Sequence, residues 1–245
     1  MPQSSGLFRR QNHRFFLPPF CWAALLALAG MVPARPALGA DLPVVFHDDF
    51  ERDKPTGWDF TDRAAWRISR DEAGKSRVLE QFQASKYEPP VRSPFNIALA
   101  GKVDVSDLVL DVKVRSTGRD YGHRDLCFIF GYEDPSHFYY VHLAKAADEH
   151  ANSIFLVNSA PRVSIAESRT SGTAWTDGWH HVRIVRRVQD GLIQVFFDQM
   201  DKPVMIAHDR HFRHGRVGVG SFDDTGMFDE IEVRGISAQP AEKSK

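Results

Sequence analysis

The stretch "GWHHVRIVRRVQDGLIQVFFDQMDKPVMIAHDRHFRHGRVGVGSFDDTGMFDEIEVRG" (Gly178 to Gly235) decides the fold. It is a series of short runs rich in Val, Ile and Phe, and each run has the length of a β-strand. The breaks between the runs, "QDG", "DKP" and "DDTG", carry the residues that favour tight turns. Helical periodicity is almost absent, so the stretch predicts consecutive strands.

The same pattern continues through the rest of the chain. Seven further runs of this kind precede residue 178: "VVFHDDF", "AAWRIS", "RVLEQF", "LVLDVKVR", "LCFIFGY", "HFYYVHLA" and "SIFLVN". About twelve strands at this spacing predict an all-β protein, a two-sheet antiparallel β-sandwich. "LVLDVKVR" alternates apolar and charged residues and therefore has one face toward the core, whereas "LCFIFGY" does not alternate and is predicted to be buried on both faces.

The two ends of the chain differ from this pattern. Residues 1–40 combine three early arginines with the apolar run "FCWAALLALAGMV" and the small-residue stretch "ARPALGA", which together predict a secretory signal peptide. The alternative is an uncleaved membrane anchor. We expect a secreted or periplasmic protein with no membrane contact in its mature form, one domain over residues 41–236, and a disordered tail over residues 237–245.

Charge and cysteine content exclude several classes of function. Residues 1–40 hold four arginines and no acidic residue, so the remainder carries a formal charge of −5 against −1 for the whole chain. That balance argues against binding to nucleic acid or to an anionic membrane surface. Cys127 is the one cysteine beyond residue 40, and its apolar neighbours predict a buried, inert thiol. We expect a monomer.

The chain resembles the concanavalin A-like lectin/glucanase superfamily. Gly178 to Gly235 follows a pattern shared by laminin G-like domains and the 3-keto-disaccharide hydrolase group, and "FGYEDPSHFYYVHLA" resembles a strand–turn–strand unit of the same superfamily. The resemblance implies a jelly roll whose first strand pairs with its last. It does not assign an activity, because one fold hosts many functions, and the carboxylate motif of the related glucanases is absent.

The strand "HFYYVHLA" (137–144) supplies the first candidate site residues. Strand alternation places Tyr139 on the core side, and it places Tyr140 and His142 together on the opposite face. Aromatic rings stack on sugar rings, and histidine bonds to hydroxyl groups or acts as an acid or base. Tyr140 and His142 are therefore the candidate catalytic residues, and the alternative is that neighbouring strands satisfy both.

Polar residues at the ends of nearby strands, together with one loop tryptophan, complete the candidate ligand-binding set. Besides Tyr140 and His142 it comprises His123, Arg124, His150, Asn152, Asn158 and Trp175. We predict recognition of a polysaccharide or glycan through the concave face of the jelly roll. The alternatives are a carbohydrate-active enzyme, either a polysaccharide lyase or a hydrolase of the 3-keto-disaccharide type, and a laminin G-like structural or protein-interaction module.

The acidic residues near the two ends of the domain form a candidate metal site. The resemblance implies that a structural Ca²⁺ can lie where the first and last strands meet, and carboxylate oxygens are the ligands that Ca²⁺ prefers. The candidate ligands are Asp48, Asp49, Asp229 and Glu230. The alternative is a solvated acidic edge that discourages strand pairing.

Overall fold

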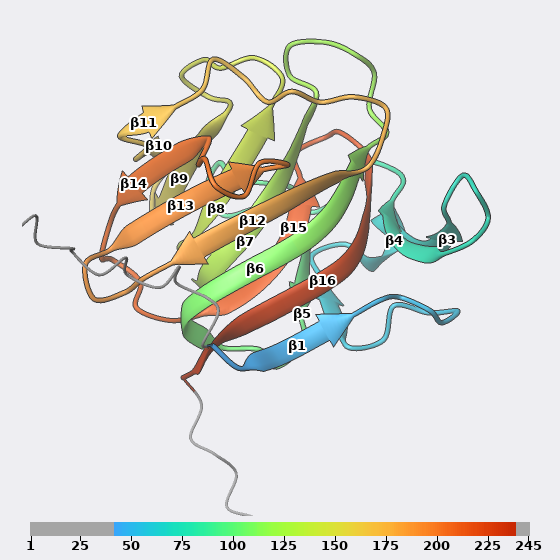
Figure 1. Ribbon diagram of the computed structural model, residues 1–245, viewed down its shortest axis with the longest axis horizontal. Coiled ribbons are helices and arrows are strands. Elements are labelled where there is room, and N and C mark those ends of the chain that lie inside the picture. The colour runs from blue at the N-terminus through green and yellow to red at the C-terminus, as the bar shows by residue number, and fades with distance from the viewer. Residues whose placement is uncertain (1–41, 239–245) are drawn as a thin grey trace, which may run out of the picture. The chain divides into compact units, whose positions relative to one another are not determined.

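The computed structural model describes residues 42–238, which form two antiparallel β-sheets packed face to face (Figure 1). This confirms the predicted all-β sandwich. Sixteen strands and one short 3-10 turn (η1, Arg63–Ala65) make up the described part, against the twelve or so strands predicted. None of the described residues belongs to a helix with the length and apolar character needed to cross a membrane.

Sheet A has nine strands and lies in front in Figure 1. Eight of them follow one another across the sheet in the order β11 (Ser168–Arg169), β14 (Met205–His208), β13 (Leu192–Phe197), β12 (His180–Arg186), β6 (Val105–Ser116), β16 (Gly226–Ser237), β4 (Arg77–Gln81) and β3 (Trp66–Arg70). The ninth strand, β1 (Val44–Asp48), pairs with β16. The first strand therefore does pair with the last, as the resemblance implied.

Sheet B has seven strands and lies behind sheet A. Their order is β10 (Val163–Ser164), β9 (Ser153–Asn158), β8 (His137–Ala144), β7 (Asp125–Asp134), β15 (Arg216–Ser221), β5 (Asn96–Ala100) and β2 (Trp58–Phe60). Each of the twelve predicted runs overlaps one of the observed strands. The strands that sequence patterns missed are β2, β5, β10 and β11, because three of them are only two or three residues long and β5 is rich in alanine, a weak strand former.

The main hydrophobic core fills the space between the two sheets. Tyr139, Val141 and Leu143 of β8 belong to it, as strand alternation predicted. Most apolar side chains of β6 also face this core, including Leu110 and Val112, whereas Val109 belongs to a small cluster on the other face. Burial of so many large apolar groups supplies the main driving force for closing the sandwich.

A second apolar cluster covers the outer face of sheet B, which is the face turned away from sheet A. It includes Cys127, Tyr140 and Phe155, and Val91 and Phe95 from the segment 82–95 pack against it. Strand β7 is therefore buried on both faces, as the absence of alternation in "LCFIFGY" predicted. This second cluster forms the floor of the candidate site.

Candidate functional site

A cavity of about 420 Å³ opens on the outer face of sheet B, and we call it the sheet B cavity. Its walls come from the segment 82–95, the loop between β6 and β7, the start of β7, the end of β8, the loops on either side of β9 and the turn after β15. The lining residues are Arg92, Phe95, Arg119, Tyr121, His123, Asp125, His142, His150, Arg162, Phe222 and Asp223. A volume of this order accommodates a small ligand or a short stretch of a sugar chain.

His142 and Asp125 face each other at the inner end of the cavity. Both residues are 3% exposed. The His142 Nε2 atom lies 2.9 Å from an Asp125 carboxylate oxygen, but the direction is not that of an N–H···O hydrogen bond. On the other side of the ring, Nδ1 lies 3.1 Å from the backbone carbonyl oxygen of His150. Because a carbonyl oxygen only accepts, Nδ1 carries the proton and donates this hydrogen bond.

Several buried polar atoms around this point have no hydrogen-bond partner within the protein. They are Asp125 Oδ1, Tyr140 OH, His142 Nε2, and Arg162 Nε and Nη1. A buried polar atom without a partner costs about 1–3 kcal/mol, so folded proteins rarely keep one without a reason. Their concentration around one cavity indicates a place where a ligand supplies the missing partners.

Arginine and aromatic side chains share the cavity wall. The Arg162 guanidinium lies 4.4 Å from the centre of the Phe222 ring and 5.3 Å from that of Phe155. Its Nη2 donates to the carbonyl oxygen of His150 at 3.0 Å. Arg92 and Arg119 add two further cations, whereas Asp125 and Asp223 are the lining acids. This balance favours an anionic or hydroxyl-rich ligand.

Asp224 lies beside the cavity and is buried. Its carboxylate accepts hydrogen bonds from the Asp125 backbone N–H at 2.7 Å and from the Tyr121 hydroxyl at 3.3 Å. Burial, together with the negative charges of Asp125 and Asp223, raises the pKa of Asp224 to about 6. Burial and the nearby carboxylates raise the pKa of Tyr121 to about 12. The Tyr121 hydroxyl therefore stays protonated and can donate to Asp224 or to a ligand.

Three of the predicted ligand-binding residues meet at this cavity. His123, His142 and His150 all line it, although they come from three different segments. Tyr140 lies beneath them with no exposed surface, because its ring stacks on Phe155 at 5.1 Å. Tyr140 is thus part of the cavity floor. The sequence predicted that it contacts the ligand directly, and its complete burial contradicts that prediction.

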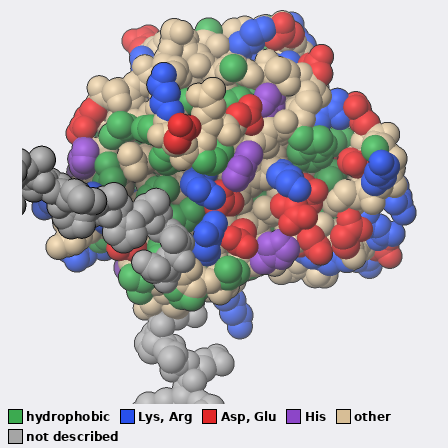
Figure 2. Space-filling view, viewed as in Figure 1, with side chains coloured by type: hydrophobic (Ala, Val, Ile, Leu, Met, Phe, Trp, Pro, Cys, Tyr) green, Lys and Arg blue, Asp and Glu red, His purple; other side chains and the backbone are tan. Residues whose placement is uncertain are grey.

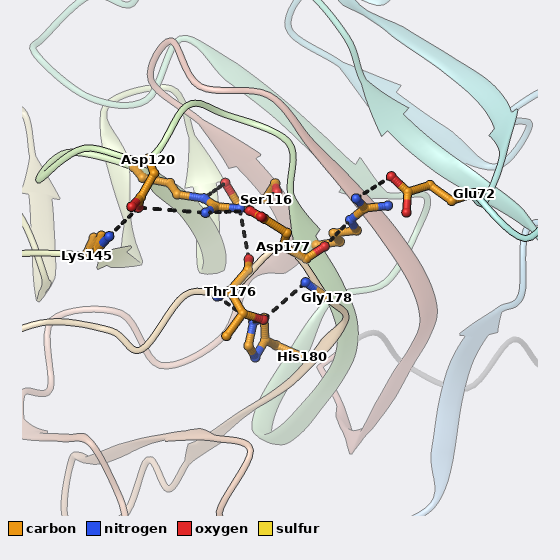
Figure 3. A network of polar contacts seen from close by, with 10 residues as sticks. Glu72, Ser116, Asp120, Lys145, Thr176, Asp177, Gly178 and His180 are labelled. Atoms are coloured by element: carbon orange, nitrogen blue, oxygen red, sulfur yellow. Dashed lines mark hydrogen bonds and ion pairs between the residues drawn. The ribbon is translucent and has the colours of Figure 1, made fainter.

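Arg124 has a structural role instead of the predicted ligand contact. Its guanidinium is 3% exposed and donates to the Ser116 carbonyl oxygen at 2.9 Å and to the Thr176 carbonyl oxygen at 2.8 Å. It also lies 3.1 Å from an Asp177 carboxylate oxygen. Figure 3 shows Ser116, Thr176 and Asp177 gathered in this network. Arg124 therefore joins the loop before β12 to the end of β6, and its guanidinium N–H groups are taken up by these partners and do not point to a ligand.

Asn152 and Trp175 are also structural. Asn152 is fully buried, its side chain donates to Thr170 O at 2.9 Å, and its Oδ1 accepts from the Thr173 hydroxyl at 2.8 Å. Trp175 is 6% exposed, donates from Nε1 to Leu143 O at 3.0 Å, and belongs to the main core. Trp175 is therefore no sugar platform, because the loop that carries it folds inward.

Asn158 lies at the wrong end of its strand for this cavity. Ser153, at the start of β9, pairs with His142, whereas Asn158 pairs with His137. The five residue steps from Ser153 to Asn158 correspond to about 16 Å along the strand. The predicted convergence of Asn158 with His142 is therefore wrong, because β9 runs away from the cavity.

The predicted calcium ligands do not come together as a ligand set. The Asp48 carboxylate accepts from the Arg52 guanidinium at 2.6 Å and from Trp58 Nε1 at 2.7 Å, so its oxygens already have partners. Glu230 pairs with His47 at 3.1 Å. Asp49 and Asp229 each accept from a neighbouring backbone N–H. In residues 42–238, the one cluster with metal-ligand geometry is elsewhere, at Asp125, Cys127 and His142.

The outer face of sheet A carries a second, shallower groove of about 340 Å³. Figure 2 shows acidic, basic and histidine side chains interleaved over this face. Asp111 lies at the centre of these charges and accepts from His181 and Arg183 at 2.8 Å and from Arg234 at 2.9 Å. These charges satisfy one another, so the sheet B cavity is the stronger candidate site.

Sequence reasoning missed much of the cavity wall. Arg162 lies in a turn segment, and Phe222 and Asp223 lie where a strand passes into the "DDTG" turn, so nothing in the sequence marks them as cavity residues. Arg119 and Tyr121 belong to "RDYGHRD", whose density of polar side chains was a usable signal. Arg92 and Phe95 are brought to the cavity by a segment with no regular structure, which no sequence pattern predicts.

Comparison with known proteins supports the fold. No family model and no curated protein matches the sequence. The carbohydrate-binding module CBM66 from Bacillus subtilis matches with a TM-score of 0.53 and 16% identity, over 73% of this chain and 96% of that one. The Emp47p carbohydrate recognition domain matches with a TM-score of 0.50 and 13% identity, over 80% of this chain and 95% of that one.

A larger protein is among the similar structures as well. The GH43 protein BlXynB from Bacillus licheniformis matches with a TM-score of 0.53 and 15% identity over 78% of this chain. This chain spans 39% of that protein. At such identities the likeness shows the fold alone. The fold is a jelly-roll β-sandwich of the concanavalin A-like type.

Proposed function

We propose that the protein binds a carbohydrate in the sheet B cavity. The observation that carries the proposal is the group of buried, unpartnered polar atoms of Asp125, His142 and Arg162 around one cavity. A sugar presents hydroxyl groups that both donate and accept, so its chemistry matches that of these atoms. Phe222 and Tyr121 add aromatic surface for the apolar faces of the sugar rings.

The charges of the cavity favour an acidic sugar, such as a uronate or a sulfated unit. Arg92, Arg119 and Arg162 line the same cavity. A guanidinium binds a carboxylate or sulfate through two parallel hydrogen bonds, which a neutral sugar cannot accept so strongly. The carbohydrate-binding module and the recognition domain of similar fold support carbohydrate as the ligand class.

Export from the cytoplasm is part of the proposal and rests on sequence. The apolar run and arginines of residues 1–40 lie outside the described residues, and so does most of the predicted tail over 237–245. A secreted or periplasmic protein meets polysaccharides directly, which fits the proposed ligand. The monomeric state, the absence of a nucleic-acid or membrane partner, and the laminin G-like interaction role stay predictions.

Affinity measurements on a panel of neutral and acidic polysaccharides test the proposal. We expect retention on acidic glycans, and we expect Arg162→Gln to weaken it at least about tenfold, because a charge-assisted hydrogen bond is lost. Arg183→Gln is the matched control, since Arg183 lies on the opposite sheet and pairs with Asp111. Equal binding by Arg162→Gln and the unchanged protein, or no binding to any glycan, would overturn the proposal.

The same incubations report turnover, which tests the enzymatic alternative. A lyase releases unsaturated uronates that absorb in the ultraviolet, whereas a hydrolase creates new reducing ends without them. Retention with neither product identifies a binding module.

A further inference from the structure

Three side chains with metal-binding atoms converge on the outer face of sheet B. Asp125 and Cys127 are two residues apart on β7 and therefore point to the same face. His142 on β8 is the register partner of Cys127. One carboxylate oxygen, the thiol sulfur and one imidazole nitrogen all lie within 4.8 Å of one another, and all three residues are buried.

The hydrogen bonding of His142 prepares it as a ligand. Nδ1 donates to the carbonyl oxygen of His150, so in the neutral ring the Nε2 lone pair points toward Asp125. Metal-binding histidines in proteins are oriented in this way, by a hydrogen bond from the other ring nitrogen to a carbonyl or carboxylate. The Nε2 atom of the His142 ring is therefore available to bind a cation.

The close contact between His142 Nε2 and the Asp125 carboxylate is stable only if a proton or a cation lies near both atoms. Nε2 and the carboxylate oxygen are 2.9 Å apart but are not aligned as a hydrogen bond. Two electron-rich atoms this close repel each other unless a proton or a metal ion lies between them or beside both. The misaligned contact leaves His142 Nε2 without a hydrogen-bond partner, and Asp125 Oδ1 also lacks one, so both groups have lone pairs that a cation could use.

We propose that Asp125, Cys127 and His142 bind a divalent transition metal ion of the zinc class. Sulfur, imidazole nitrogen and carboxylate oxygen form a ligand set that suits Zn²⁺, whose tetrahedral bonds of about 2.0–2.3 Å separate ligand atoms by about 3.3–3.7 Å. The observed spacing needs shifts of about 1 Å or less to reach that range. Asp125 and His142 line the sheet B cavity, so an ion held between them would lie at its inner end.

The test uses the full chain and cobalt(II) as a probe of thiolate ligation. After treatment with a chelator, one equivalent of Co²⁺ is expected to produce the near-ultraviolet charge-transfer band of a cobalt–thiolate bond. Cys127→Ser is expected to lose the band, whereas Cys21→Ser, which changes the other cysteine of the chain, is expected to keep it. Absence of the band in the unchanged protein, or its persistence in Cys127→Ser, would refute the site.

A second variant guards against misfolding of the first. Asp125→Asn keeps the size of the side chain and leaves the Cys127 thiol in place, so the cobalt–thiolate band is expected to remain. Loss of the carboxylate is expected to weaken Zn²⁺ affinity at least about tenfold, as measured by competition with a chromophoric chelator. His211→Gln is the control for adventitious surface binding, because His211 pairs with Asp209 outside the site. Unchanged Zn²⁺ affinity in Asp125→Asn would refute the assignment.

Metal binding is read here without any glycan, so failure of the metal test leaves the carbohydrate proposal standing. A bound metal ion would use Asp125 and His142 and would leave Arg162 and the other lining residues for the sugar. Glycan titrations with and without Zn²⁺ distinguish the two uses of Asp125 and His142.

Discussion

Replacement of Arg124 by alanine separates a structural role from a ligand-binding role. The guanidinium is buried, donates to the carbonyl oxygens of Ser116 and Thr176, and pairs with Asp177. Each hydrogen bond from a charged group contributes about 1.5–3 kcal/mol, and removing one partner of a buried pair typically costs about 3–5 kcal/mol. We therefore expect Arg124→Ala to lower the free energy of unfolding by about 4 kcal/mol.

Urea denaturation followed by tryptophan fluorescence measures this loss, and a thermal scan should show a fall in Tm of about 8–16 °C for a domain of this size. Arg119→Ala is the matched stability control, since Arg119 is exposed and is expected to change stability by no more than about 0.5 kcal/mol. Glycan affinity of the folded Arg124→Ala protein should match that of the unchanged protein. A variant with normal stability and abolished glycan binding would contradict the structural role.

Two further predictions concern Asp111 and Trp175. Burial alone raises the pKa of Asp111, but hydrogen bonds from His181 and Arg183 outweigh it and hold the pKa below its ordinary value of 3.8. The stabilisation of the folded state by Asp111 is therefore complete above pH 3.8 and is lost as the pH falls below it. Asp111→Asn should lower the free energy of unfolding by about 2 kcal/mol at neutral pH and by progressively less in acid, as measured by urea denaturation across this pH range. A loss of stability that does not depend on pH would contradict this. Trp175→Phe should lower the free energy of unfolding by about 1–3 kcal/mol, because the hydrogen bond to the Leu143 carbonyl oxygen and some core contacts are lost. Glycan retention on an affinity column should not change. Weakened retention by a variant of full stability would show that Trp175 contacts the sugar after all.

The candidate site was predictable only in part. Strand alternation correctly placed His142 on the outer face of sheet B, and the polar segment "RDYGHRD" correctly indicated a cavity wall through His123. Arg124 occurs in the same segment but turns inward, because the carbonyl groups of Ser116 and Thr176 lie within its reach and accept its hydrogen bonds. No local pattern distinguishes a solvated arginine from one that satisfies buried carbonyl groups, since the acceptors are distant in sequence.

Cys127 illustrates the same limit. Its apolar neighbours correctly predict burial, because strand β7 lies in the middle of sheet B with apolar layers on both faces. The register that sets His142 opposite Cys127 depends on how β8 pairs with β7. A shift of one residue would turn His142 to the other face of the sheet and dissolve the cluster.

The amino-acid sequence by itself determined the fold class, twelve of the strands and the faces on which the side chains of residues 108–115 in β6 and 138–143 in β8 lie. Those properties follow from the two-residue period of a strand and from turn chemistry, which are local. Only the tertiary structure decided which polar residues meet. The sheet B cavity combines residues from six separate segments, and their convergence depends on strand order, register and the packing of the segment 82–95, which are properties of the whole sandwich.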